Sequence, residues 1–123
     1  MTPEQAEGFA RDWIANWNRT DIDTIVGHFA PDARFTSPRA LAVTGNATVE
    51  GTAALRAYWR TARERAGDLH FTLDYVLFDP ARQELCVVYN ATLGGATTRA
   101  CEFMRFDAEG RQIAGEAMYG APV

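Results

Sequence analysis

The stretch ELCVVYNATLGGATTRACEFMRF (residues 84–106) predicts two antiparallel strands joined by a tight turn. Gly94 and Gly95 separate two runs rich in β-branched and aromatic residues, which is the pattern of a two-residue hairpin. This turn pairs Val87 with Glu102. Because side chains alternate along a strand, one face of the hairpin carries Leu85, Val87, Tyr89, Ala100, Glu102 and Met104. The opposite face carries Cys86, Val88, Asn90, Arg99, Cys101 and Phe103. A carboxylate therefore shares a face with large apolar residues.

Two more strands flank this hairpin. Residues 68–78 alternate apolar and polar side chains, and residues 111–120 follow a turn written DAEG. If that turn is a four-residue loop, Gly115 lies beside Glu102 on the last strand. Ala117 and Tyr119 then follow on the same face, and residues 68–120 form a four-stranded meander.

Helical patterns precede the meander. Thr2 can cap a helix that starts at Pro3, and Phe9, Trp13 and Trp17 recur every four residues, which is helical spacing. A short second helix follows a cap at Asp21. Three further segments come next: a short strand at 33–38, a loop over 38–50 with at most a brief strand, and a third helix at 51–67.

The order of these elements predicts the α+β class. A curved, mostly antiparallel sheet would wrap around three N-terminal helices that pack on one face, in a cone-shaped barrel. The length of 123 residues and the absence of repeats favour a single domain over 1–123.

Composition excludes several classes of protein. The net charge is −4, and no stretch concentrates the basic residues that a phosphate backbone requires, so we expect no nucleic-acid partner. No apolar run reaches the length of a membrane span, and we expect no membrane association. With no secretion signal at the N-terminus and only two cysteines, we expect a cytoplasmic protein with reduced thiols.

The face that carries Glu102 must also receive the helical aromatic residues. A sheet curved around that layer can enclose an apolar pocket with a carboxylate inside, which is the usual form of a small-molecule site. Burial should raise the pKa of Glu102 and make it a candidate catalytic acid, with Tyr119 as its candidate partner. The candidate ligand-binding residues are Trp13, Trp17, Ser37, Tyr58, Phe71, Val87, Tyr89, Met104 and Gly115. For each tyrosine, core packing with a satisfied hydroxyl is the competing interpretation.

The two histidines indicate no metal site, because they lie far apart in the sequence without a paired ligand. His28 ends the second helix, where a structural role is the simpler interpretation, and His70 alternates outward on its strand. No nucleotide-binding or nucleophile motif is present, so we expect no cofactor.

Three segments resemble the nuclear-transport-factor-2-like superfamily, closest to its SnoaL-like and ketosteroid-isomerase-like branches: WIANWNRTDIDTIVGHFAPDARFTSP (13–38), EGTAALRAYW (50–59) and FMRFDAEGRQIAGEAMYG (103–120). The resemblance implies a deep pocket and a dimer. Steroid isomerases of this fold use a tyrosine, a general-base aspartate and a late-strand acid. Trp13 and Ser37 occupy the first two places here and only Glu102 matches, so we do not expect the steroid-isomerase mechanism.

Three functions stay open. The chain could be a cofactor-independent isomerase, cyclase, lyase or hydrolase that uses Glu102 on a hydrophobic small molecule. It could instead bind an apolar ligand without catalysis, or be a structural dimer with a vestigial pocket. An apolar outer sheet face would support a homodimer through Val88, Cys101 and Phe103. That face would also include Val76, Phe78 and, if the last register holds, Met118.

Overall fold

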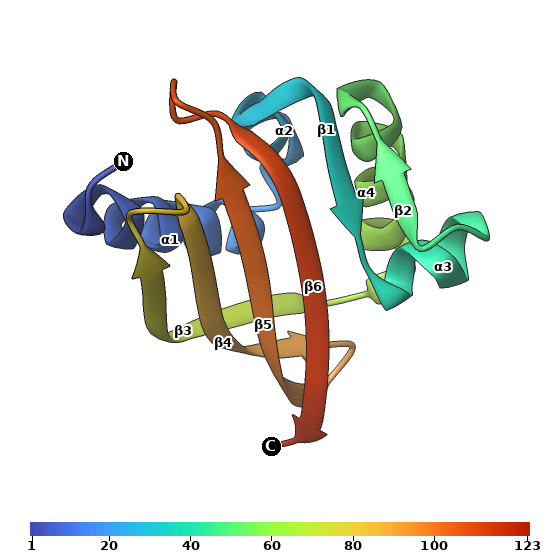
Figure 1. Cartoon of the computed structure of the whole chain (residues 1–123). Helices are drawn as coiled ribbons and strands as arrows, with labels where there is room; N and C mark the ends of the chain where they lie inside the picture. Colours follow the sequence, from blue (N-terminus) through green and yellow to red (C-terminus); the bar gives the residue numbers. More distant parts are fainter.

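The computed structural model covers residues 1–123 and shows four helices on one side of a six-stranded sheet (Figure 1). The helices are α1 (Pro3–Asn18), α2 (Ile22–Gly27), α3 (Pro38–Thr44) and α4 (Thr52–Ala66). The strands are β1 (Phe29–Thr36), β2 (Thr48–Glu50), β3 (Leu69–Asp79), β4 (Glu84–Leu93), β5 (Ala96–Phe106) and β6 (Gln112–Pro122). This arrangement confirms the α+β class.

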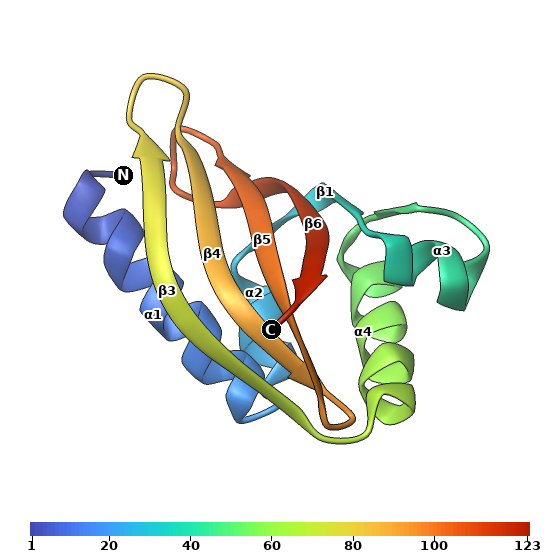
Figure 2. The same cartoon turned by 90° about the horizontal axis from the view of Figure 1, so that it is seen from below.

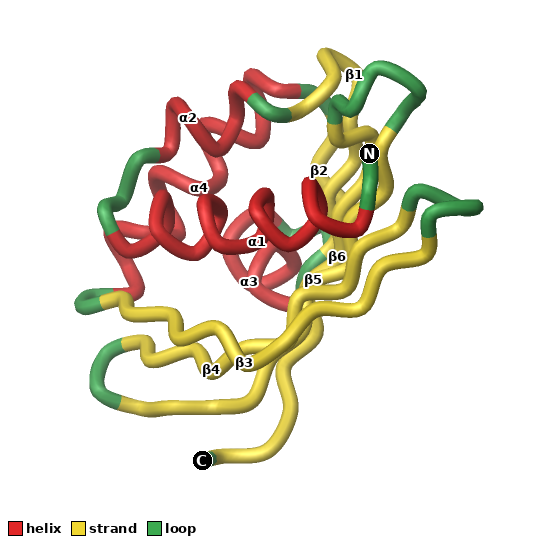
Figure 3. Tube along the Cα trace, turned by 90° about the vertical axis from the view of Figure 1, so that its left-hand side faces the viewer, coloured by secondary structure: helices red, strands yellow, loops and turns green.

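The strand order in the sheet is β2-β1-β6-β5-β4-β3, and only the β1–β6 pair is parallel. The sheet is strongly curved but does not close into a barrel (Figure 2). From the side, the ends of β3 and β4 curl beneath the helical layer (Figure 3). The helices therefore cover the concave face of the sheet (Figure 3), and most of the hydrophobic core lies between these two layers.

The N-terminal helix begins as the sequence predicts. The Thr2 hydroxyl accepts from the backbone N–H of Gln5 at 3.1 Å, and the Gln5 side chain accepts from the backbone N–H of Thr2 at 2.8 Å. Together with Pro3 in the first turn, this reciprocal capping box satisfies two backbone donors at the helix N-terminus. Trp13 and Trp17 lie four residues apart on one face of α1 and are buried against Phe71 of β3.

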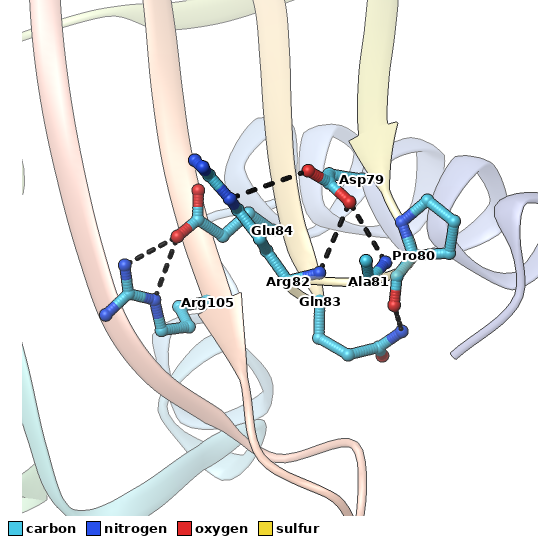
Figure 4. A network of polar contacts seen from close by, with 7 residues as sticks. All are labelled: Asp79, Pro80, Ala81, Arg82, Gln83, Glu84 and Arg105. Carbon is cyan, nitrogen blue, oxygen red and sulfur yellow. Dashed lines mark hydrogen bonds and ion pairs between the residues drawn. The ribbon is translucent and has the colours of Figure 1, made fainter.

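The central hairpin also has the predicted register, with Val87 opposite Glu102 and Tyr89 opposite Ala100. Gly94 and Gly95 both have positive φ, at 59° and 86°, as a tight turn between twisted strands requires. At the other end of β4, the Asp79 carboxylate accepts from the backbone N–H groups of Ala81 and Arg82 and closes the β3–β4 turn (Figure 4). Both ends of β4 are therefore fixed by local turn chemistry.

The sequence pattern predicted a loop over residues 38–50 with at most a brief strand, but the structure has a helix, α3, and a short strand, β2, in this segment. Ser37 caps α3 by accepting from the Arg39 backbone N–H at 3.1 Å, Pro38 starts the helix, and Gly45 ends it with φ of 81°. The short strand β2 then pairs with β1. A helix of seven residues is too short to show a clear hydrophobic period, so only its capping residues indicate it.

Two registers differ from expectation because extra residues bulge out of the ladder. In β3 a bulge at Asp74 reverses the faces beyond it, so Tyr75 and Leu77 point outward. Val76 and Phe78, expected on the outer face, instead pack against the core.

Near the start of β6, the loop is one residue longer than expected and a second bulge falls at Ile113. The two changes together shift the β5–β6 register by two residues. Ala117, not Gly115, therefore lies beside Glu102, whereas Gly115 pairs with Met104. Because the shift is even, Gly115, Ala117 and Tyr119 keep the expected face.

Candidate functional site

Two neighbouring rows of residues on the concave sheet face build the site. Tyr89, Ala100 and Tyr119 pair across β4, β5 and β6, and the next row holds Val87, Glu102 and Ala117. Both tyrosines are therefore diagonal neighbours of Glu102, within reach of long side chains. The small alanines beside them leave room above the sheet.

That room is a cavity of about 60 Å³ between the sheet and helices α1 and α4. Half of its sixteen lining residues are aromatic, and four are polar or charged: Ser37, Glu102 and two arginines. The lining residues are Trp13, Trp17, Phe35, Ser37, Arg39, Tyr58, Trp59, Ala62, Arg63, Ala66, Leu69, Phe71, Tyr89, Leu93, Glu102 and Tyr119.

Packing between rings holds the aromatic wall in place. Trp13 stacks on Phe71 with centroids 5.8 Å apart and meets Tyr89 edge to face at 5.3 Å, while Trp17 meets Trp59 edge to face at 5.6 Å. Phe71 is itself fixed by Asn18 at the end of α1, whose side chain donates to its backbone C=O at 2.9 Å and accepts from its N–H at 2.7 Å. Ring packing and two hydrogen bonds therefore attach the wall to α1.

The Glu102 side chain is 5% exposed and reaches the cavity from the middle of β5. Burial raises its pKa from 4.5 to about 8, and no neighbouring charge or hydrogen bond contributes to the shift. An isolated carboxyl in an apolar cavity holds its proton because the charged form loses its hydration there. Glu102 is therefore a proton donor near pH 7.

The three cavity tyrosines are also proton donors. Burial is the main reason that the pKa of Tyr58 and Tyr89 is raised and that the pKa of Tyr119 reaches about 12. For all three groups, the negative charge of Glu102 raises the pKa further and the positive charge of Arg39 lowers it. The indole N–H of Trp17 is buried and has no acceptor. The cavity thus gathers hydrogen-bond donors and has no group that is a strong base at neutral pH.

Comparison with known proteins identifies the family to which this architecture belongs. A model of the SnoaL-like domain family matches residues 10–115. The chain belongs to this family. The expected resemblance to SnoaL-like and related nuclear-transport-factor-2-like proteins is therefore confirmed. No curated protein matches the chain significantly.

Several solved structures share the SnoaL-like fold. A SnoaL-like protein of unknown function from Burkholderia thailandensis E264 is 29% identical with a TM-score of 0.87, and 98% of each chain is covered. A protein with a cystatin-like fold from Methylobium petroleophilum PM1 is 24% identical with a TM-score of 0.79, over 100% of this chain and 80% of that one. SalBIII, an epoxide hydrolase/cyclase-like enzyme with a role in pyran ring formation in the polyether salinomycin, is 18% identical with a TM-score of 0.77, over 98% and 95% of the two chains.

The SnoaL-like cavity brings together most of the residues that the sequence singled out. Of the eleven candidates, eight line it: Trp13, Trp17, Ser37, Tyr58, Phe71, Tyr89, Glu102 and Tyr119. Val87 and Met104 share the face of Glu102 but are fully packed in the core. Gly115 lies outside the lining because a register shift places it against Phe35 and Gln112.

Arg39 and Arg63 are lining residues that the sequence reasoning missed. Arg39 lies in α3, the segment that was expected to be a loop, and its guanidinium sits over the Tyr119 ring, 4.8 Å from the centroid. The capping pattern Ser37-Pro38 was the available signal for this helix. Arg63 lies on α4, and no motif in the sequence marks it as a cavity residue.

The histidines lie outside the cavity. His28 caps the C-terminus of α2 and meets Phe9 edge to face at 5.1 Å, and His70 is exposed on β3. No three His, Cys, Asp or Glu side chains gather in an arrangement suited to a metal ion. None of the four helices combines the length and apolar character needed to cross a bilayer.

Proposed function

We propose that this SnoaL-like protein is a cofactor-independent acid–base enzyme, of the isomerase, cyclase, lyase or hydrolase type, that acts on a hydrophobic small molecule. The observation that supports the proposal is Glu102, a carboxyl at the wall of an aromatic cavity whose pKa burial raises to about 8. Perturbed acids of this kind concentrate at functional sites because a catalytic acid works best with a pKa near the working pH.

Protonated Glu102 would donate a hydrogen bond, or its proton, to an oxygen of the substrate. On a carbonyl this stabilises the negative charge that develops on oxygen, and on an epoxide or ether it assists cleavage of the C–O bond. Tyr119, a diagonal neighbour on β6, would be a second donor to the same oxygen. The aromatic wall would hold the rest of the molecule away from water.

In this proposal the protein supplies the catalytic acid, Glu102, and no catalytic base. Ser37 and Trp13 stand where steroid isomerases of this fold place the aspartate base and the tyrosine, and neither can abstract a proton from carbon unaided. Glu102 is the one carboxyl that lines the cavity. Water that enters with the substrate, or a group of the substrate itself, would accept the proton that is lost.

Replacement of Glu102 tests this proposal. Wild-type protein is incubated with carbonyl and epoxide compounds, and products are followed by mass spectrometry. Glu102→Gln should abolish turnover while circular dichroism stays unchanged, because the amide keeps the shape of the side chain but cannot release a proton. Glu116→Gln, an exposed glutamate on the adjacent strand, is the matched control and should keep full activity. Turnover that survives Glu102→Gln would contradict the proposal.

Binding without catalysis is the second candidate. The absence of a second carboxyl in the cavity favours it, because most acid–base reactions need both an acid and a base. In this case Glu102 would hold one polar atom of an apolar ligand. Ligand affinity that is only weakened by Glu102→Gln, with no product from any compound, would support this candidate. A purely structural domain would show neither binding nor turnover.

We also propose that the protein is a homodimer through the outer face of the sheet. Tyr75, Leu77, Phe103 and Met118 are exposed there by 43 to 60%, and Val88 and Cys101 are half-buried between them. Monomers seldom expose so much continuous apolar surface, and an apolar sheet face can pair with the same face of a second copy. Light scattering should report a dimer for the wild type and a monomer for Phe103→Asp. A wild-type monomer at micromolar concentration would contradict this proposal.

A further inference from the structure

The positive charges of this protein are unevenly compensated. All twelve basic residues are arginines, and eight of them form ion pairs with Asp or Glu. The four without an acidic partner are Arg19, Arg39, Arg63 and Arg65. Arg19 donates a hydrogen bond to the amide oxygen of Asn16. In a chain with more acids than bases, unpaired cations are the exception.

The other three unpaired arginines gather at one place. Arg39 and Arg63 line the aromatic cavity, and Arg39 and Arg65 line an adjoining groove between α3 and α4. These two helices lie side by side (Figure 2). These residues come from two helices that are separate in the sequence. The fold therefore concentrates uncompensated positive charge at the entrance to the cavity.

Neutral groups hold two of these guanidinium groups in position. Arg63 donates from Nε to the Thr20 hydroxyl at 3.1 Å and from Nη1 to the Gly67 carbonyl, so its Nη2 has no partner. Arg39 rests on the ring of Tyr119. Such contacts orient an arginine without neutralising it, and they leave the Nη2 group of Arg63 and the guanidinium of Arg39 able to donate to a carboxylate or phosphate.

The cavity is therefore polar at two separated points. The negative charge of Glu102 raises the pKa of three tyrosines, and the positive charge of Arg39 lowers it. These tyrosines are Tyr58, Tyr89 and Tyr119. The Glu102 side chain is buried in the middle of β5, whereas Arg39 is exposed on α3 and rests on the ring of Tyr119, so the carboxyl and the guanidinium lie at different depths of the cavity. A ligand that spans the cavity would meet a neutral proton donor at one end and a fixed cation at the other.

We propose that the ligand of this site is a small amphipathic oxyanion, with its anionic group held by Arg39 and Arg63 at the entrance and its apolar body in the aromatic cavity. The inference rests on the proposed function in taking this cavity as the ligand site. The volume of about 60 Å³ limits the enclosed part to a short chain or a small ring. The oxyanion is a carboxylate or a phosphate monoester, because both match the arginine fork.

Three probes with one apolar chain test the inference: hexanoate, hexyl phosphate and the uncharged hexanamide. Trp13, Trp17 and Trp59 are the only tryptophans and all line the cavity, so intrinsic fluorescence and the three indole N–H signals in NMR report its occupancy. Hexanoate or hexyl phosphate should bind the wild type at least about tenfold more tightly than hexanamide, the usual effect of a hydrogen bond to a charged group. The tighter of the two anions identifies the class of oxyanion.

Substitutions of single arginines show whether Arg39 and Arg63 cause the preference for anions. Arg39→Gln and Arg63→Gln should each weaken anion binding about tenfold, toward the affinity for hexanamide, and leave hexanamide binding unchanged. Arg60→Gln is the matched control, because Arg60 lies on the same helix, pairs with Asp23 and does not line the cavity. Arg39 is exposed, so its replacement carries the test if the Arg63 variant fails to fold.

Three results would count against these proposals in distinguishable ways. Equal binding of anions and hexanamide would overturn the inference and leave the proposed cavity site intact. Anion binding that Arg39→Gln does not weaken would also overturn it. If no probe perturbs the tryptophan signals, both the inference and the proposed site at Glu102 fail.

Discussion

The most demanding prediction concerns how stability changes with pH. Glu102 holds its proton in the folded protein up to a pH of about 8, whereas in the unfolded chain it ionises near the ordinary value of 4.5. Between these values the folded state binds one more proton than the unfolded state. The free energy of unfolding must therefore fall as the pH rises through this window.

The size of the effect follows from the pKa difference of about 3.5 units, at about 1.36 kcal/mol per unit. The contribution is complete below pH 4.5 and is lost progressively up to pH 8, for a total of about 5 kcal/mol. This is a large share of the roughly 5–15 kcal/mol that stabilises a small domain. Glu102→Gln is neutral at every pH and lacks this dependence.

Urea unfolding of the wild type and of Glu102→Gln, followed by tryptophan fluorescence at each pH from 4 to 9, measures the difference. Any pH-independent effect of the amide on the free energy of unfolding cancels when the difference between the two proteins at one pH is compared with that at another. Relative to the variant, the free energy of unfolding of the wild type should fall by about 1.4 kcal/mol per pH unit between about pH 5 and pH 8. Glu116→Gln, a replacement on the exposed face of β6, should run parallel to the wild type.

A constant difference between the wild type and Glu102→Gln across that range would refute the reasoning. It would mean that the carboxyl ionises at its ordinary pH in the folded state and is therefore hydrated. The proton donor on which the proposed function depends would then be absent. A direct NMR titration of the Glu102 carboxyl carbon gives the same answer independently.

Three other outcomes are expected. Turnover should fall about tenfold per pH unit above pH 8, as Glu102 loses the proton it must donate; a rate that rises there would contradict its role as the acid. Asn18→Ala should lower the free energy of unfolding by about 1–3 kcal/mol and expose the Phe71 amide to hydrogen exchange, since it removes both bonds from α1 to β3. Gly115→Ala should cost about 1–3 kcal/mol in urea unfolding, because a Cβ there would lie 3.0 Å from Cδ1 of Phe35; unchanged stability would mean that the ring moves freely.

Local signals predicted the parts of the fold that local chemistry decides. Gly94 and Gly95 determine the central register, and that register alone places Glu102 and Tyr89 on one face. The capping residues Thr2 and Gln5 mark the start of α1, and the four-residue spacing of Trp13 and Trp17 marks its buried side. These features depend on turns and caps whose residue requirements are strict.

Bulges and non-local pairings could not be predicted in the same way. The bulge at Asp74 reverses the faces of Tyr75 and Val76, yet nothing in the alternation of residues 68–78 marks it. The parallel pairing of β1 with β6 joins segments almost eighty residues apart, and no turn connects them. Arg39 was missed for a different reason, because the signal of a seven-residue helix is confined to its cap.

The contact between Asn18 and Phe71 also occupies part of an open strand edge. β3 is the long edge strand of the sheet, and an unpaired strand edge invites a strand from another molecule to add to it. The Asn18 amide occupies the N–H and C=O of Phe71 that such a strand would need, and the bulge at Asp74 bends the edge further along. One side chain at the end of a helix thus makes, at Phe71, the two backbone hydrogen bonds that a seventh strand would make there, and a strand added at this edge would have to displace it.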